Sequence, residues 1–103
     1  MTKIIQENHD RLVRLCAKHK VKSLEIFGSA LDESRFKTSG SDIDFLVEFL
    51  PLEPVAHAKS YFGLLRELQE LFKRGIDLVE AGAIKNPYFL QAVNRERKPV
   101  YEA

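Results

Sequence analysis

Between Asp42 and Phe49 the side chains alternate between two kinds, and this alternation limits the possible folds more than any other feature. One set of alternate positions is apolar: Ile43, Phe45, Val47 and Phe49. The other set is mainly acidic: Asp42, Asp44, Leu46 and Glu48. Successive side chains of a β-strand point to opposite faces of the sheet. The segment is therefore predicted to be a strand with one apolar face against a core and one acidic face.

The flanking sequence predicts helices and further strands around this one. Apolar residues at helical spacing indicate amphipathic helices, and short β-branched runs next to glycine or proline indicate strands. In chain order we expect a helix over 2–19, a strand over 21–27, a short helical turn and polar loop over 30–41, the strand over 42–49, a helix over 55–72, a strand over 76–80, a short helix over 87–94 and a strand over 99–101. Such an order predicts α/β or α+β architecture, in which helices pack against a small mixed sheet.

The helix over 55–72 carries two apolar stripes. The first contains Val55, Ala58, Phe62, Leu65 and Phe72. The second contains Tyr61, Leu64, Leu68 and Leu71. We expect the first stripe to contact the sheet, and the second to serve either the same core or an interface with another chain. Pro54 suits the first turn of this helix, and Gly75 is expected as its C-cap.

Composition limits the class of protein. The 103 residues, 45% of them apolar, suffice for one core, so we expect a single domain over 1–103. A net charge of +1 argues against a protein that grips nucleic acid through bulk positive charge. The lone Cys16 excludes an internal disulfide, and neither a leader nor a long apolar run is present, so a cytoplasmic protein is expected. His9 is interpreted as a partly buried helix residue, with a catalytic role as the alternative.

The near-neutral total conceals a separation of charge along the chain. Residues 1–20 carry a net charge of +3, whereas residues 25–53 carry −5. Asp42 and Asp44 are two apart in the predicted strand, so their carboxylates share a face with Cα atoms ~6.6 Å apart. Asp77 lies in another predicted strand. If the two strands are neighbours, the three carboxylates form a metal-binding triad of the kind used in phosphoryl and nucleotidyl transfer.

Gly28 and Ser29 follow a predicted strand directly. Glycine lets the backbone approach a phosphate closely, and a serine hydroxyl with neighbouring N–H groups can donate to phosphate oxygens. Taken singly, each motif also has an ordinary structural interpretation: a turn, a solvated strand face or a salt-bridged surface residue.

The ordered combination resembles the minimal nucleotidyltransferase family of the DNA polymerase beta superfamily. The resemblance rests on Phe27-Gly28-Ser29, then Ser41-Asp42-Ile43-Asp44-Phe45, then Ile76-Asp77-Leu78-Val79. It implies that Gly28 and Ser29 hold the β- and γ-phosphates of an incoming nucleotide. It also implies that Asp42 and Asp44 coordinate two Mg²⁺ ions, and that Asp77 completes one metal site and helps to deprotonate the acceptor hydroxyl.

The sequence departs from the family pattern after the glycine-serine pair. These proteins usually carry an arginine there, but Gly28-Ser29 is followed here by Ala30-Leu31-Asp32-Glu33. Arg35 and Lys37 are the nearby cations that could replace the missing charge.

The resemblance further implies a partner. Many members of this family are antitoxins paired with an all-helical HEPN protein, and the implied reaction transfers AMP from ATP to a hydroxyl of that partner. The alternative is a non-catalytic binding module of the same fold that neutralises its partner by contact. Direct binding of nucleic acid is not expected, because the chain has no basic stripe with interleaved aromatic residues. A homodimer is left open.

Overall fold

The computed structural model describes residues 3–27, 42–83 and 97–103. The elements in chain order are α1 (Lys3–Glu7), α2 (His9–Lys18), β1 (Val21–Phe27), β2 (Ile43–Phe49), α3 (Pro54–Phe72), β3 (Ile76–Glu80), the 3-10 helix η2 (Ala81–Ala83) and β4 (Arg97–Glu102). The turn expected within 30–41 and the helix expected over 87–94 lie outside the described residues. None of the described helices combines the length and the apolar character needed to cross a membrane.

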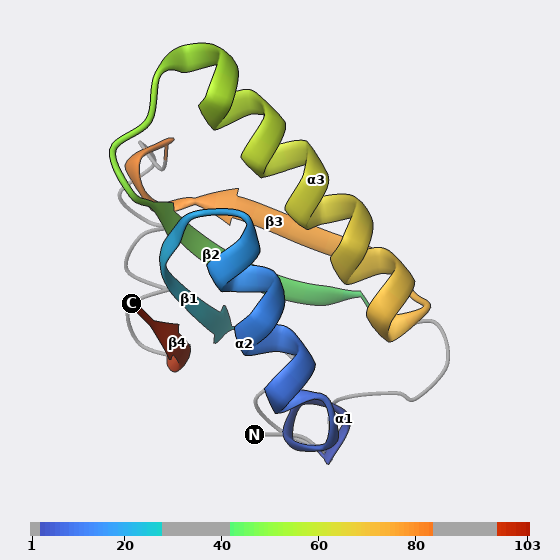
Figure 1. Ribbon diagram of the computed structural model, residues 1–103. Coiled ribbons are helices and arrows are strands. Elements are labelled where there is room, and N and C mark those ends of the chain that lie inside the picture. The colour runs from blue at the N-terminus through green and yellow to red at the C-terminus, as the bar shows by residue number, and fades with distance from the viewer. Residues whose placement is uncertain (1–2, 28–41, 84–96) are drawn as a thin grey trace.

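The four strands form one mixed sheet in the order β3-β2-β1-β4. β1 pairs antiparallel with both β2 and β4, whereas β2 and β3 are parallel and are connected through α3. α2 and α3 lie side by side over one face of this sheet (Figure 1). The predicted mixed sheet with packed helices is confirmed.

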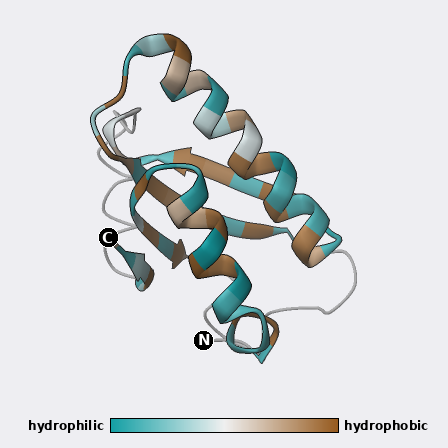
Figure 2. Cartoon of the chain, in the orientation of Figure 1, coloured by the Kyte–Doolittle hydropathy of each residue, from teal (hydrophilic) through white to brown (hydrophobic). Residues whose placement is uncertain are grey.

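The main core lies between the helices and the sheet. The apolar positions of β2 face the helices as the alternation predicts, and Figure 2 shows apolar residues along the strands and on the covered sides of the helices. The buried core residues are Ile5, Leu12, Cys16, Val21, Leu24, Ile26, Ile43, Phe45, Val47, Phe49, Leu64, Leu68, Phe72, Leu78 and Val100. A smaller cluster unites Phe27 and Leu46 with the partly buried Val79 and Ala81. Leu46 therefore interrupts the acidic face of β2 with a buried apolar contact.

The single helix predicted over 2–19 is wrong, because the helix is broken at Asn8. The side-chain amide of Asn8 donates to the backbone carbonyl of Ile4 at 2.8 Å. The backbone carbonyl of Asn8 accepts from the N–H of Leu12. Asparagine competes in this way with regular helical hydrogen bonds, and it begins α2 here. His9, predicted to be partly buried, is exposed.

The prediction for the two stripes on α3 is confirmed in part: the second stripe serves the same core, one of its two predicted roles, whereas the first stripe reaches the core only in part. Val55 and Phe62 of the first stripe are 68% and 66% exposed. The buried residues are Leu64, Leu68 and Phe72, which repeat every four residues and so lie along one side of the helix. The second stripe thus supplies most of the core contacts.

The end of α3 also differs from the prediction. Lys73, not Gly75, adopts the left-handed conformation at the C-cap (φ 55°, ψ 43°), and its N–H donates to the carbonyl of Gln69 at 2.8 Å. Gly75 follows this cap and has a different role at the candidate site.

Polar contacts tie α2 to α3 at the end of α2. Lys18 Nζ donates to Glu67 Oε1 at 2.8 Å, and His19 Nε2 donates to Glu67 Oε2. These two hydrogen bonds lower the pKa of Glu67. The His19 ring lies against Gly63, where an added Cβ would come within 2.8 Å of Cε1. Glycine in the middle of α3 therefore makes room for the histidine that binds Glu67.

We expect Gly63→Ala to destabilise the protein by about 1 kcal/mol. Alanine in a helix interior normally gains about 1 kcal/mol over glycine. Here the methyl group displaces His19 and breaks a charge-assisted hydrogen bond worth roughly 1.5–3 kcal/mol. In a His19→Ala background the obstacle is gone, so the same substitution should stabilise. Urea unfolding of the four proteins of this double-mutant cycle measures the effect, and a Gly63→Ala effect of the same sign in both backgrounds would contradict the explanation.

Candidate active site

The structure brings the three predicted carboxylates to the same ends of two neighbouring strands. In the parallel pair β2–β3, Asp44 lies directly opposite Asp77. Strands in a sheet are about 4.8 Å apart, and paired residues of parallel strands share a face. Asp42, two positions before Asp44, belongs to that face as well. The condition set by the sequence, that these strands are neighbours, is confirmed.

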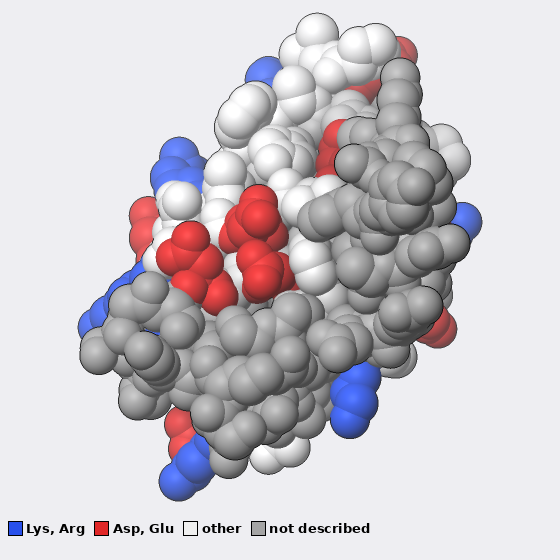
Figure 3. Space-filling view, turned by 180° about the vertical axis from the view of Figure 1, so that it is seen from behind, with Lys and Arg blue, Asp and Glu red and all other residues white. Residues whose placement is uncertain are grey.

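The three carboxylates belong to the sheet face opposite to α2 and α3. Ile43 and Phe45, which flank Asp44, point into the core beneath the helices, so Asp44 points the other way. Figure 3, which views the molecule from behind, shows acidic side chains grouped near the middle of this face. The acidic face predicted from the alternation thus carries a concentration of negative charge.

The environments of the three carboxylates differ. Asp42 and Asp77 are exposed, whereas Asp44 is half-buried. Burial, followed by the negative charges of Asp77 and Asp42, raises the pKa of Asp44 to about 6. Asp77 is therefore open to solvent although it lies within a strand between apolar neighbours. Among the three carboxylates, Asp44 is the one whose charged form is disfavoured by burial and by the neighbouring negative charges.

The predicted phosphate-binding residues Gly28 and Ser29 lie outside the described residues. β1 ends at Phe27, which is paired with Asp44. The end of β1 therefore lies next to the carboxylates. The roles of Gly28 and Ser29 stay predictions, as does the replacement of the usual arginine by Arg35 or Lys37.

Gly75 is a site residue that the sequence interpretation missed. Its carbonyl accepts the N–H of Ile43 at 3.1 Å, which ties the start of β3 to the start of β2. A Cβ on residue 75 would lie 2.8 Å from Cγ of Asp42 and closer still to Oδ1. The absence of a side chain here leaves room for the Asp42 carboxylate. The sequence does show a glycine directly before the strand that carries Asp77. That glycine was interpreted as a helix C-cap, so its role beside Asp42 was not predicted.

The donor chemistry of the group fits a magnesium ion. Carboxylate oxygens are the ligands that Mg²⁺ prefers, and a divalent cation would relieve the repulsion that, after burial, contributes to the raised pKa of Asp44. Within the described ranges, no three His, Cys, Asp or Glu side chains converge closely enough to hold an ion as they stand. Coordination by all three carboxylates would therefore require their side chains to turn toward a common point.

Comparison with known families identifies the class of protein to which this site belongs. The family model described as "Polymerase beta, Nucleotidyltransferase" matches residues 10–103. The chain belongs to this nucleotidyltransferase family. Among its relatives from Methanocaldococcus jannaschii, one named as a candidate protein adenylyltransferase is 39% identical, over 91% of this chain and 89% of the relative. A second, named in the same way, is 33% identical over the same shares.

Solved structures place this nucleotidyltransferase near minimal members of the family. A chain described as a candidate minimal nucleotidyltransferase is 26% identical, with a TM-score of 0.68 over 92% of this chain and 91% of that one. A toxin-antitoxin structure with AMP-PNP gives a TM-score of 0.68 at 21% identity, over 93% and 74% of the two chains. A complex of the tri-AMPylated Shewanella oneidensis HEPN toxin with its MNT antitoxin gives 0.64 at 21%, over 95% and 72%. The resemblance found in the sequence is confirmed at the level of family and fold.

Proposed function

We propose that this nucleotidyltransferase transfers AMP from ATP to a hydroxyl group of a partner protein, and that it acts as the antitoxin of a pair with an all-helical HEPN toxin. The observation that carries the proposal is the pairing of Asp44 with Asp77 across β2 and β3, beside the end of β1. The names of the relatives and the AMPylated toxin in the neighbouring complex support this acceptor class. Residues 1–103 would act as one nucleotidyltransferase domain.

In the proposed reaction an acceptor oxygen attacks the α-phosphorus of ATP. The new bond joins that oxygen to the α-phosphorus, the bond from the α-phosphorus to the oxygen bridging to the β-phosphate breaks, and pyrophosphate leaves. Two Mg²⁺ ions, when bound, would neutralise the charge that develops on the phosphate and lower the pKa of the attacking hydroxyl. Asp42 and Asp44 would hold them.

The remaining residues of the proposed site bind and orient the reactants. Asp77 would complete one metal site and, being exposed, is accessible for the proton of the acceptor hydroxyl. Gly28 and Ser29 would bind the β- and γ-phosphates. Val55 and Phe62 are exposed apolar residues on the first half of α3, and such residues support an acceptor that arrives as a protein.

Transfer of label tests the proposal. The purified chain is incubated with Mg²⁺ and the HEPN-type protein encoded beside it, once with ATP labelled on the α-phosphate and once on the γ-phosphate. We expect label on the partner only from the α-phosphate, and none after EDTA treatment. A partner that is neutralised without receiving label would instead show a binding module that acts by contact.

Gly75→Ala is expected to reduce the rate of AMP transfer by about 10- to 100-fold, because a displacement of the order of 1 Å in a catalytic group has effects of this size. The new methyl group would push the Asp42 carboxylate out of its place. The matched control is Gly82→Ala, since a Cβ on residue 82 meets nothing within 4 Å. Initial rates with labelled ATP measure both variants, and equal rates for the two would contradict the proposed role of Gly75.

A further inference from the structure

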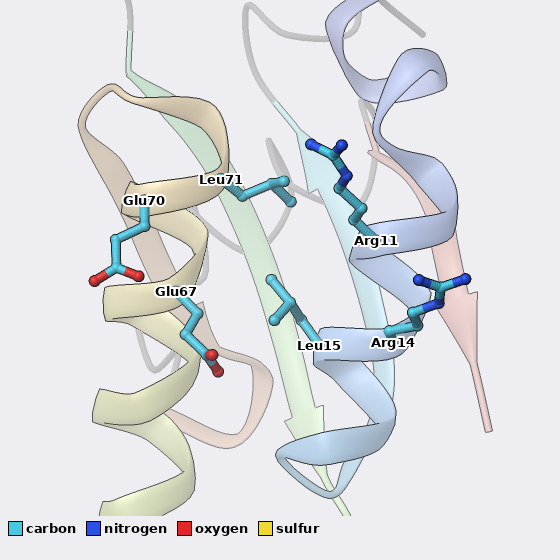
Figure 4. A pocket seen from close by; sticks show the side chains of 6 residues that line it. All are labelled: Arg11, Arg14, Leu15, Glu67, Glu70 and Leu71. Carbon is cyan, nitrogen blue, oxygen red and sulfur yellow. The ribbon is translucent and has the colours of Figure 1, made fainter.

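A groove separates α2 and α3 on the helical side of the molecule, away from the carboxylates. It has a volume of about 390 Å³ and is lined by Arg11, Arg14, Leu15, Glu67, Glu70 and Leu71. Figure 4 shows Leu15 and Leu71 pointing into the space between the helices, which gives the groove an apolar floor. We refer to these six residues as the α2–α3 groove.

The two walls of the α2–α3 groove carry opposite charges. The arginines both belong to α2, and the glutamates both belong to α3 (Figure 4). Glu67 is already bound by Lys18 and His19. In the part of the chain that the structure describes, Arg11, Arg14 and Glu70 form no ion pair. Complementary charges thus flank the groove without neutralising one another, and Figure 4 shows Arg14 and Glu70 extending outward from its two sides.

We propose that the α2–α3 groove is the interface of a symmetric dimer formed with a second copy of this chain. A two-fold axis along the groove would place α2 of each copy over α3 of the other. Arg11, Arg14 and Glu70 line the same stretch of the groove. This rotation therefore places the two arginines of one copy over Glu70 of the other. The two-fold symmetry repeats the contact with the roles of the copies exchanged. The apolar floors, with Leu15 and Leu71, meet at the axis.

Self-complementarity favours a second copy over other occupants. A two-fold interface uses the same patch on both subunits, so a patch with positive charge on one side of the axis and negative charge on the other matches itself. A partner of uniformly acidic or basic character would leave one wall facing like charge, which is unfavourable. The carboxylates belong to the opposite face of the sheet, so this dimer leaves both candidate active sites open. The inference is therefore independent of the proposed function.

Reversal of charge on each wall tests the dimer. One variant carries Arg11→Glu and Arg14→Glu, and the other carries Glu70→Arg. Each alone brings like charges together at both halves of the interface, so we expect its dimer dissociation constant to rise by about 10-fold or more. Mixed in equal amounts, the two variants make opposite charges meet again at both halves. We expect the mixture to form a heterodimer with an affinity within about threefold of the original.

Sedimentation velocity, together with light scattering after size exclusion, measures these affinities, and circular dichroism checks that each variant is folded. Lys59→Glu, an exposed charge reversal on α3 outside the groove lining, is the matched control and should leave the affinity unchanged. A native chain that is monomeric at about 100 µM would overturn the proposal, because specific dimers usually associate below this concentration. So would variants that associate as well as the native chain, a mixture that does not associate, or a groove that binds only a different protein.

Discussion

Asp44→Asn is expected to reduce the rate of AMP transfer by about 100- to 1,000-fold, the usual effect of removing a group that stabilises charge in the transition state. Asparagine has nearly the shape of aspartate but lacks the negative charge with which Asp44 would help to hold Mg²⁺. The same substitution should make the metal-free protein more stable. A loss of activity that accompanies a gain of stability separates a catalytic effect from unfolding.

The gain in stability follows from the raised pKa of Asp44. The folded protein holds this proton up to about pH 6, whereas an aspartate in the unfolded chain loses it near 3.8. A raised pKa contributes stability that is present below pH 3.8 and is lost as the pH rises through 6. At pH 7.5 the charged Asp44 therefore destabilises the metal-free fold by about 1 kcal/mol, after allowance for solvent screening of a half-exposed group.

Urea unfolding in EDTA, at pH 7.5 and at pH 4, measures this difference between Asp44→Asn and the native chain. We expect the stabilisation at pH 7.5 and its near disappearance at pH 4. Glu48→Gln is the matched control, since Glu48 is an exposed carboxylate on the same face of β2, paired with Lys22 at 3.5 Å. It should leave the rate of AMP transfer unchanged. A similar loss of activity in both variants would show that AMP transfer depends on the negative charge of the whole face and not on Asp44 in particular.

The strands were the most predictable part of the fold, because their pattern repeats every two residues and leaves little freedom of interpretation. β1, β2 and β3 begin and end within one residue of the predicted bounds. The neighbouring position of β2 and β3 did not follow from either strand alone. It depends on the connection through α3, which returns the chain parallel to β2.

The orientation of the helices was less predictable, because α3 carries apolar residues on more than one of its sides. Hydropathy cannot distinguish Phe62 from Leu64, yet the first is 66% exposed and the second is fully buried. The direction in which a helix faces its sheet is set by the packing of the whole row from Leu64 to Phe72. The break at Asn8 similarly depends on one side-chain hydrogen bond to Ile4, which a periodic pattern does not reveal.

The candidate site was predictable as a set of charges but not as an arrangement. The sequence marks Asp42, Asp44 and Asp77, whereas only the fold shows that Asp44 is the half-buried member with the raised pKa. Gly75 escaped notice because its contribution is empty space beside a residue 33 positions earlier in the chain. Space of this kind is visible only once β2 and β3 are placed together.

Phe45→Ala is expected to destabilise the protein by about 3–5 kcal/mol, the usual cost of emptying a fully buried aromatic position. Phe45 is completely buried in the middle of β2, and its ring centroid lies 6.0 Å from that of Phe72 on α3. A domain of this size has a total stability of roughly 5–15 kcal/mol, so the loss is a large fraction of it. Urea unfolding should show a lower midpoint with little change in slope.

Phe62→Ala provides the matched control, because it removes the same ring from a position on α3 that is 66% exposed. We expect its effect on the free energy of unfolding to stay within about 0.5 kcal/mol. The sequence places both phenylalanines in apolar stripes that face the core, so the pattern alone predicts similar costs. Equal destabilisation by the two variants would mean that α3 turns Phe62 inward, contrary to the structure. A large difference would confirm that Leu64, Leu68 and Phe72 form the buried side of α3 and hold β2, with Asp44 on its far face, in place.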